Sequence, residues 1–245
     1  KRIWKESLGR YGVRKVWQQL KREGYVIARC TVARLMQKLG IQGVWRGKNK
    51  QTTRSRDDQK RADDLVKRNF NADHPDQLWV PDFTYIQTHS GWVYTAFIID
   101  VFSRTIVGWK VSTRMNTDMV LDALEQALHD RGMPKNVIHH SDRGVQYLSI
   151  RYTNRLEAAN LRASVGTTGD SYDNALAETV NGLYKTEVIE YLKADWQGLA
   201  DVQLATLNWV DWFNKKRVHS ALGYVSPFEF EAMYYDKINP LGQVA

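Results

Sequence analysis

The stretch Gln77-Leu-Trp-Val-Pro-Asp82-Phe-Thr-Tyr-Ile86 decides the fold of this chain of 245 residues. It is rich in aromatic and β-branched residues, a composition that favours a β-strand. A second run of this kind, Val137-Ile-His-His-Ser-Asp142, ends on an aspartate. The two runs therefore predict two strands that each carry one carboxylate, Asp82 and Asp142.

A third acidic residue, Glu178, lies in the helical pattern Asp173-Asn-Ala-Leu-Ala-Glu178-Thr-Val, and 35 residues separate it from Asp142. Carboxylates drawn from separate elements onto one point repel each other unless a cation lies between them. Hard oxygen ligands suit Mg²⁺ or Mn²⁺. We therefore expect Asp82, Asp142 and Glu178 to converge on divalent metal, although each of them singly could be an ordinary surface charge.

The charge of the chain is distributed unevenly. The formal net charge is +8, but residues 1–60 hold 17 Lys and Arg against 4 Asp and Glu, and the other 185 residues have a net charge of −5. A basic arm on a mildly acidic body indicates a polyanionic partner. Nucleic acid fits better than a membrane, because no apolar run approaches the ~18 residues that span a bilayer. The single cysteine, Cys30, suits a reducing cytoplasm.

Residues 1–45 show the spacing of a small helical domain. In Tyr11-Gly-Val13-Arg-Lys-Val16-Trp-Gln-Gln-Leu20 the apolar residues recur on one helix face, and Gly24 ends the pattern. Cys30-Thr-Val32-Ala-Arg-Leu35-Met36-Gln-Lys-Leu39-Gly40 repeats this spacing. Two short helices with a tight link resemble a helix-turn-helix, which predicts a DNA-binding domain. An ordinary helical hairpin with a solvated basic face remains the alternative.

Polar and basic residues of this domain and of the linker after it are the expected DNA contacts. In the helical domain they are Arg14, Lys15, Arg29, Thr31, Arg34 and Lys38. The linker spans residues 46–72, and its first part is free of hydrophobic residues, so it can lie on phosphates or serve as a plain tether. Its candidate contacts are Arg46, Lys48, Lys50, Arg54 and Arg56.

Residues 73–235 are expected to form an α/β core, followed by a tail over 236–245. Three strand-like runs come first, and helices and short strands then alternate, which is the order of an RNase H-like mixed sheet. The predicted strands are 78–87, 93–100, 105–112, a short run to Asp142, and 162–164. The predicted helices are 117–131, 149–160, the segment with Glu178, and 198–216.

Six motifs in this order resemble a known family. They are Tyr11-Gly-Val-Arg-Lys with Val32-Ala-Arg-Leu-Met, Trp79-Val-Pro-Asp82-Phe-Thr-Tyr-Ile, Ile99-Asp-Val-Phe-Ser-Arg104-Thr-Ile-Val-Gly-Trp109, His140-Ser-Asp142-Arg-Gly-Val-Gln-Tyr147, Tyr172-Asp-Asn-Ala-Leu-Ala-Glu178 with Lys185, and Asn214-Lys-Lys-Arg217-Val-His219-Ser-Ala-Leu-Gly-Tyr224. The chain resembles the integrase-type catalytic subunit of bacterial insertion-sequence transposases, in the branch named after insertion sequence three. That branch belongs to the DDE group, alongside retroviral integrases.

The resemblance implies a DNA transposase that cleaves element ends and joins the 3′-OH to DNA. Asp82, Asp142 and Glu178 would be its catalytic ligands for two Mg²⁺ (or Mn²⁺) ions. The implied partners are double-stranded DNA, as terminal inverted repeats and target, and further copies of the chain, at least a dimer on paired ends. The implied location is the bacterial cytoplasm, on the nucleoid. Further DNA contacts are expected at Arg143, Gln146, Lys185, Lys215 and Arg217.

Several residues near these motifs have plainer explanations. Asp100 could be a fourth ligand, but a capping role at a strand end or pairing with Arg104 is favoured. Asp173 and Asn174 suit a helix cap. His139 and His140 are not needed as bases if metal activates the nucleophile. The tryptophans expected to pack on the sheet rather than stack on bases are Trp79, Trp92 and Trp109.

Two other functions remain open at this point. An RNase H-like nuclease or resolvase would use the same carboxylates without joining DNA, but the basic module and the C-terminal motif argue against it. A DNA-binding regulator with an inactive core is opposed by the intact acidic trio.

Overall fold

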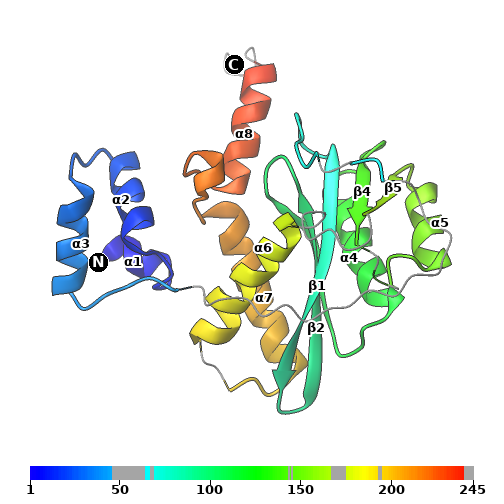
Figure 1. Cartoon of the computed structure of the whole chain (residues 1–245), viewed down its shortest axis with the longest axis horizontal. Helices are drawn as coiled ribbons and strands as arrows, with labels where there is room; N and C mark the ends of the chain where they lie inside the picture. Colours follow the sequence, from blue (N-terminus) through cyan, green and yellow to red (C-terminus); the bar gives the residue numbers. More distant parts are fainter. Residues whose placement is uncertain are drawn as a thin grey trace.

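A computed structural model describes residues 1–45, 64–66, 69–142, 144, 146–166, 175–192 and 195–239. Figure 1 shows a small group of N-terminal helices beside a larger α/β core. Among the described residues, each helix is too short or too polar to cross a lipid bilayer.

The N-terminal helices are α1 (Arg2–Glu6), α2 (Val13–Arg22) and α3 (Arg29–Lys38). The last two confirm the helices expected from the apolar spacing, and α1 was not predicted. Gly24 has φ +84° just after α2, a backbone conformation that glycine adopts without strain. Val16, Val32 and Met36 are buried, so the inward faces of α2 and α3 pack as the spacing indicates.

The core contains a five-stranded mixed sheet of order β3-β2-β1-β4-β5. Its strands are β1 (Leu78–Thr88), β2 (Gly91–Asp100), β3 (Ile106–Ser112), β4 (Ile138–Ser141) and β5 (Arg162–Val165). The first three strands pair antiparallel, and β4 pairs parallel with both β1 and β5. The five strands agree with the predicted ones, and their order and directions are those of the RNase H-like mixed sheet expected above.

Helices cover both faces of the sheet (Figure 1). One face carries α4 (Thr117–Asp130) and α5 (Ile150–Ala158), whose Leu124 and Tyr152 pack with Trp79 in one hydrophobic cluster. The opposite face carries α6 (Ala175–Tyr184) and α7 (Leu199–Lys215), whose side chains join Phe97 in a second cluster. Each large side chain buried fully in this way contributes about 1.5–3 kcal/mol.

Helix α6 continues without a break into a π-helical segment, η1 (Lys185–Glu190). Such segments are rare and often mark functional sites. After α7 the chain forms a short turn, η2 (Ser220–Leu222), and a final helix, α8 (Pro227–Ile238). Helix α8 was not predicted, although Ser226 and Glu229 form a capping box at its N-terminus.

The N-terminal helices dock on the core near η1 and the end of α7. The Tyr11 hydroxyl donates to Lys216 O at 3.1 Å and accepts from Val218 N at 2.7 Å. Arg10 Nε donates to Glu187 O at 3.0 Å, and its guanidinium lies 4.7 Å from the ring centroid of Trp212. These contacts tie the N-terminal helices to the helical segment that carries Glu178.

Candidate active site

Asp82 lies on β1 and faces helix α6. It pairs across the sheet with Phe97, whose ring packs against Tyr184 of α6 at a centroid distance of 5.2 Å. Directly paired residues of antiparallel strands share a face, so Asp82 points to the α6 side. Its Oδ2 accepts a hydrogen bond from Asn181 Nδ2 at 2.8 Å, and its Oδ1 accepts from Phe83 N at 2.8 Å. The half-buried carboxylate is therefore fixed from two directions.

Asp142 follows the end of β4, the parallel neighbour of β1. The register joins Trp79 to His139, and Asp82 and Asp142 each lie three residues further along their strands. Equal offsets on adjacent parallel strands bring the two aspartates side by side. Asp142 Oδ1 accepts from Gly144 N at 2.9 Å, and a Cβ on Gly144 would lie only 3.0 Å from that oxygen. The turn that holds Asp142 thus depends on a residue without a side chain.

Glu178 lies in the first turn of α6, three residues before Asn181. Residues at this spacing share one helix face. Because Asn181 hydrogen-bonds Asp82, the face of α6 that carries Glu178 is turned toward β1. The three acids expected at the site therefore come from three elements that meet beyond the end of β4.

The electrostatics of Asp82 report this convergence. Burial, and after it the charges of Asp142 and Glu178, raise the pKa of Asp82 to about 7. The hydrogen bonds from Phe83 and Asn181 act in the opposite direction and lower the pKa. Desolvation also raises the pKa of Asp142, against the hydrogen bond from Gly144. Carboxylates with raised pKa values, coupled to each other, are typical of sites that bind a cation or exchange protons.

The donor atoms suit a divalent cation, since all of them are hard carboxylate oxygens. A cation between Asp82 and Asp142 would also relieve the repulsion that raises the pKa of Asp82. Within the described ranges, however, no three Asp, Glu, His or Cys side chains form a group that could hold one ion. The carboxylate oxygens are therefore of the type that binds a divalent cation, but the described side chains are not gathered closely enough to form the expected three-donor cluster.

Two residues beside the acids were missed by the sequence analysis. Asn181 contacts Asp82 directly, and its place three residues after Glu178 is a signal that could have found it. Tyr147 is buried, and burial together with Tyr152, Asp82 and Asp142 raises its pKa well above the usual value. It therefore forms a neutral wall beside the two aspartates.

Several expected DNA contacts lie where DNA could reach them. On the N-terminal helices, Arg14, Arg29, Arg34 and Lys38 are exposed and Thr31 is half-buried. Gln146 is half-buried, and its side-chain oxygen would lie 3.5 Å from a Cβ on Gly144. Lys185 follows α6 and places its Nζ 4.7 Å from the ring centroid of Tyr85 on β1. Their contact with DNA remains a prediction.

Arg217 contradicts the expectation that it contacts DNA, whereas for Lys15 that expectation remains a prediction. Arg217 is 5% exposed and donates to Glu187 through Nε and Nη2, the latter at 2.7 Å. Lys15 is half-buried, with its Nζ 5.1 Å from the Tyr11 ring centroid, and burial lowers its pKa to about 7. Both cations serve the junction between the N-terminal helices and the core. Lys215 is exposed and pairs with Asp211 one helical turn before it.

Some predicted contacts lie outside the described residues, namely Arg46, Lys48, Lys50, Arg54, Arg56 and Arg143. The same holds for the expected caps Asp173 and Asn174.

The plainer explanation of Asp100 is confirmed. Its Oδ2 accepts from the N and Oγ of Ser103 at 2.8 and 2.7 Å, and its Oδ1 accepts from Asp76 N at 2.9 Å. Asp100 thus closes the turn after β2. His139 is buried beside Tyr152, and burial lowers its pKa to about 3, so it stays neutral in the core.

Of the tryptophans expected to pack on the sheet, Trp79 is fully buried and Trp109 is partly buried against the second cluster. Trp92 is 49% exposed, so that expectation is wrong for this residue.

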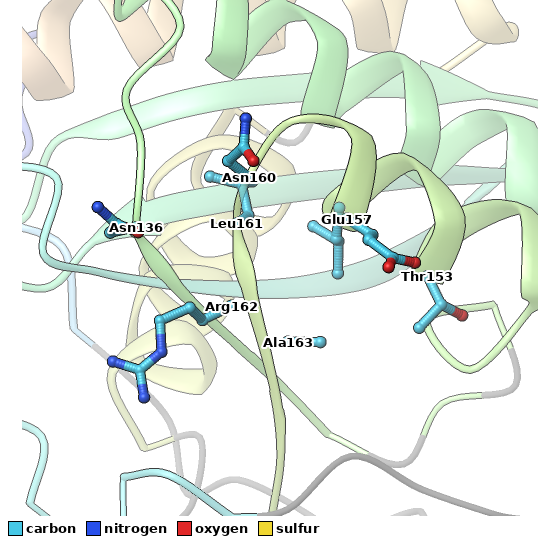
Figure 2. A pocket seen from close by; sticks show the side chains of 8 residues that line it. Asn136, Thr153, Glu157, Asn160, Leu161, Arg162 and Ala163 are labelled. Atoms are coloured by element: carbon cyan, nitrogen blue, oxygen red, sulfur yellow. The ribbon is translucent and has the colours of Figure 1, made fainter.

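A shallow, open depression of about 440 Å³ lies between α5 and β5 (Figure 2). Its lining residues are Asn136, Thr153, Leu156, Glu157, Asn160, Leu161, Arg162 and Ala163. None of them is among the acids or the expected DNA contacts, so the depression is separate from the candidate site.

Two kinds of family model match the chain. An HTH-like domain matches residues 1–49, and integrase core domains match residues 72–171 and 159–227. The transposase for insertion sequence element IS629 of Shigella sonnei is 56% identical, over 97% of this chain and 79% of the relative. A putative transposase for IS986/IS6110 of Mycobacterium tuberculosis is 52% identical over 96% and 86%. Transposase InsF for IS3A of Escherichia coli is 34% identical over 92% and 78%.

Solved structures share the fold at low identity. A chain in the structure of the simian T-cell lymphotropic virus intasome, solved in complex with PP2A regulatory subunit B56 gamma, matches with a TM-score of 0.57 and 17% identity. The match covers 76% of this chain and 61% of the intasome chain. The HTLV-2 integrase catalytic core domain, solved with magnesium, matches with a TM-score of 0.52 and 17% identity, over 66% and 99%. These likenesses confirm the expected RNase H-like core.

Proposed function

We infer a DNA-cutting and DNA-joining activity for this chain, which belongs to the insertion-sequence transposases that carry an integrase core domain. The resemblance stated from its motifs is thereby confirmed, and DNA transposition is the function of this family. The proposal adds the chemistry: cleavage at the ends of a DNA element, followed by attack of the freed 3′-OH on a second phosphodiester.

One observation carries the chemical proposal. The carboxylate of Asp82 has its pKa raised to about 7, first by burial and then by Asp142 and Glu178. Two acids from other elements thus act on one buried acid, an arrangement that costs stability and that function explains best. The same three residues are the acids that the resemblance of the motifs implied.

Asp82, Asp142 and Glu178 would hold the metal, with Asn181 keeping Asp82 in place through its hydrogen bond. Two bound Mg²⁺ or Mn²⁺ ions would supply the Lewis acidity that stabilises the entering and leaving oxygens of the phosphodiester. Tyr147, which is buried near the two aspartates, would close the inner side of the site.

Cationic residues around the acids would bind the DNA backbone. Lys185 lies past the end of α6 and would bind a phosphate next to the cut. The exposed face of α3, with Arg29, Arg34 and Lys38, would enter a groove of the terminal repeat. Two or more copies of the chain would pair the two ends of the element.

The experiment is a cleavage and joining assay on duplexes that carry the terminal repeats of the element, with and without Mg²⁺. Wild-type protein is expected to cut and join only with Mg²⁺. Glu178→Gln is expected to bind the duplex with unchanged affinity and to lose both reactions. Cleavage without joined product would favour a nuclease or resolvase. Equal activity of Glu178→Gln would remove the catalytic assignment.

A further inference from the structure

Strand β1 runs well past its parallel neighbour β4. Residues Leu78 and Trp79 pair with β4, whereas β1 continues to Thr88 together with β2 (Figure 1). We call the part from Asp82 to Thr88 the open edge. It begins at the acid of the candidate site and ends at a hairpin tip.

The hairpin tip is held in place by the segment before α7. His89 N donates to Trp196 O at 2.9 Å, and Ser90 N donates to Gln197 O at 3.0 Å. Side chains near the tip therefore project from a fixed backbone rather than from a free loop.

Two aromatic side chains lie together on this hairpin and remain open to solvent. Tyr85 and Trp92 are 43% and 49% exposed. Their rings contact edge to face, with centroids 5.4 Å apart and an interplanar angle of 83°. Large aromatic side chains usually bury most of their surface in a core, so a half-exposed pair on a rigid hairpin has ring surface available to a ligand.

A cation lies at the same place. The Nζ of Lys185 is 4.7 Å from the Tyr85 ring centroid, and Lys185 follows the helix that carries Glu178. Tyr85 is three residues after Asp82, about 10 Å along the strand, and its side chain starts on the opposite face of the sheet because successive side chains alternate. Lys185 follows the helix on the Asp82 face and still contacts the Tyr85 ring, so the two faces meet at the open edge of β1. A strand whose phosphate lies at Asp82 would therefore pass over this edge to bring a base to the ring and the ammonium group.

We propose that Tyr85 and Trp92, with Lys185, form a stacking site for an unpaired DNA base beside the acidic residues. Every base has a π-face that can lie on an aromatic ring, while a neighbouring cation holds the backbone. Bases inside an intact duplex have both faces covered, so the site takes a base of a melted or cut strand end. This site deepens the proposed function and rests on it for the identity of the DNA.

Binding of two single-stranded probes to the whole protein tests the site without any divalent metal. One probe is an oligothymidylate of about 12 nucleotides, within the range that stacking surfaces cover. The other has the same length and charge but carries abasic sites in place of thymidines. Wild-type protein is expected to bind the thymidylate about tenfold more tightly, since a thymine can stack on the aromatic pair and an abasic site cannot.

Substitutions on the hairpin should remove this base preference. Tyr85→Ala and Trp92→Ala are expected to bind the two probes equally, whereas Tyr85→Phe and Trp92→Phe keep a ring and most of the preference. Thermal unfolding followed by circular dichroism checks that each variant is folded. If one alanine variant does not fold, the test is made with the other alanine variant and its phenylalanine counterpart.

The chain offers a matched control on α8. Tyr235 is 47% exposed and meets Tyr234 edge to face, with centroids also 5.4 Å apart. Tyr235→Ala should leave the preference for thymidylate unchanged. A wild-type protein that binds both probes equally, or a Trp92→Ala protein that keeps the preference, would overturn the proposal.

Failure of this site can be told from failure of the transposase chemistry. The probe assay needs neither metal nor cleavage, whereas the joining assay needs both. A protein that prefers thymidylate and yet joins no DNA would refute the proposed function alone.

Discussion

Asp82, which is half-buried, and Glu187, which is buried, are two acids with opposite electrostatics. For Asp82, burial and then the charges of Asp142 and Glu178 raise the pKa to about 7. For Glu187, burial opposes ionisation, but Arg217, Lys15 and the indole of Trp209 hold the pKa below its usual value. One acid has been buried among like charges and the other has been buried with its counterion.

The difference separates a region that maintains the fold from the region for which we propose the chemistry. Glu187 accepts three hydrogen-bond contacts from Arg217 within 3.1 Å and one from Trp209, and its backbone oxygen accepts from Arg10. The charge of Glu187 is therefore balanced by Arg217 within the fold, and the contact with Arg10 joins the N-terminal helices to the core. At Asp82, in contrast, burial and the charges of Asp142 and Glu178 disfavour the ionised carboxylate, and a bound cation would favour it.

The largest expected effect is on activity at Asp82. Asp82→Asn keeps the size of the side chain and its acceptor for Phe83 N but removes one metal-binding charge. We expect joining of DNA to fall about 1,000-fold, because metal stabilisation of the transition state is worth several kcal/mol. The free energy of unfolding without metal should stay equal or rise, since one repelling charge is gone. A large loss of stability would mean that Asp82 is structural, like Glu187.

The next effect is on stability at Glu187. Glu187→Gln leaves Arg217 buried without its counterion, and we expect the free energy of unfolding in urea to fall by about 3–5 kcal/mol. The double variant Glu187→Met with Arg217→Met should recover most of this loss, because replacing both ions with apolar groups removes the unpaired charge. A loss below about 1 kcal/mol in the single variant would contradict a counterion role.

A smaller effect is expected at Asn181, which lies between the two regions on α6. Asn181→Ala removes the hydrogen bond to Asp82, and such supporting contacts are typically worth about 10- to 100-fold in metal affinity or activity. The Mg²⁺ concentration for half-maximal joining should rise accordingly. Thr179→Ala, an exposed position of the same helix, is the matched control. Unchanged Mg²⁺ dependence in Asn181→Ala would show that Asp82 is positioned by the backbone alone.

The sequence predicted the acidic region better than the junction. Asp82 and Asp142 each lie in or directly after a strand with a clear β pattern, so local composition placed both. Arg217, in contrast, belongs to the basic run Lys215-Lys-Arg217, which has the composition of a surface. Its burial depends on Glu187, 30 residues away, and on the rings of Phe213 and Trp212. No local pattern reports a partner at that separation.

Three other differences between the sequence predictions and the structure, at α8, η1 and Trp92, also have physical reasons. The capping box and the proline at the first position of α8 are local signals that could have predicted that helix. The π-helical turn η1 has no such signal, because it arises where α6 meets the N-terminal helices. Trp92 was expected to pack because tryptophan usually does, and its exposure follows from the length by which β1 and β2 pass the rest of the sheet.

The smallest expected effect is a pH dependence that belongs to the junction alone. Burial and repulsion from Arg217, opposed by Glu187, lower the pKa of Lys15 to about 7, whereas lysine in the unfolded chain has the ordinary value of 10.5. Between these values the unfolded chain binds more protons than the folded one, so stability rises with pH across this window. We expect a gain of about 1 kcal/mol between pH 7 and 9, since Lys15 keeps partial contact with solvent.

Lys15→Met should remove this gain, as measured by urea unfolding at both pH values. Lys38→Met, at an exposed position of α3, should leave it in place. If stability rises equally in all three proteins, the ammonium group of Lys15 is hydrated in solution, and the junction is held by Glu187 and Arg217 without it. Loss of the gain in Lys15→Met alone would show that Lys15 is desolvated in the folded protein, beside Tyr11 and within the influence of Arg217 and Glu187.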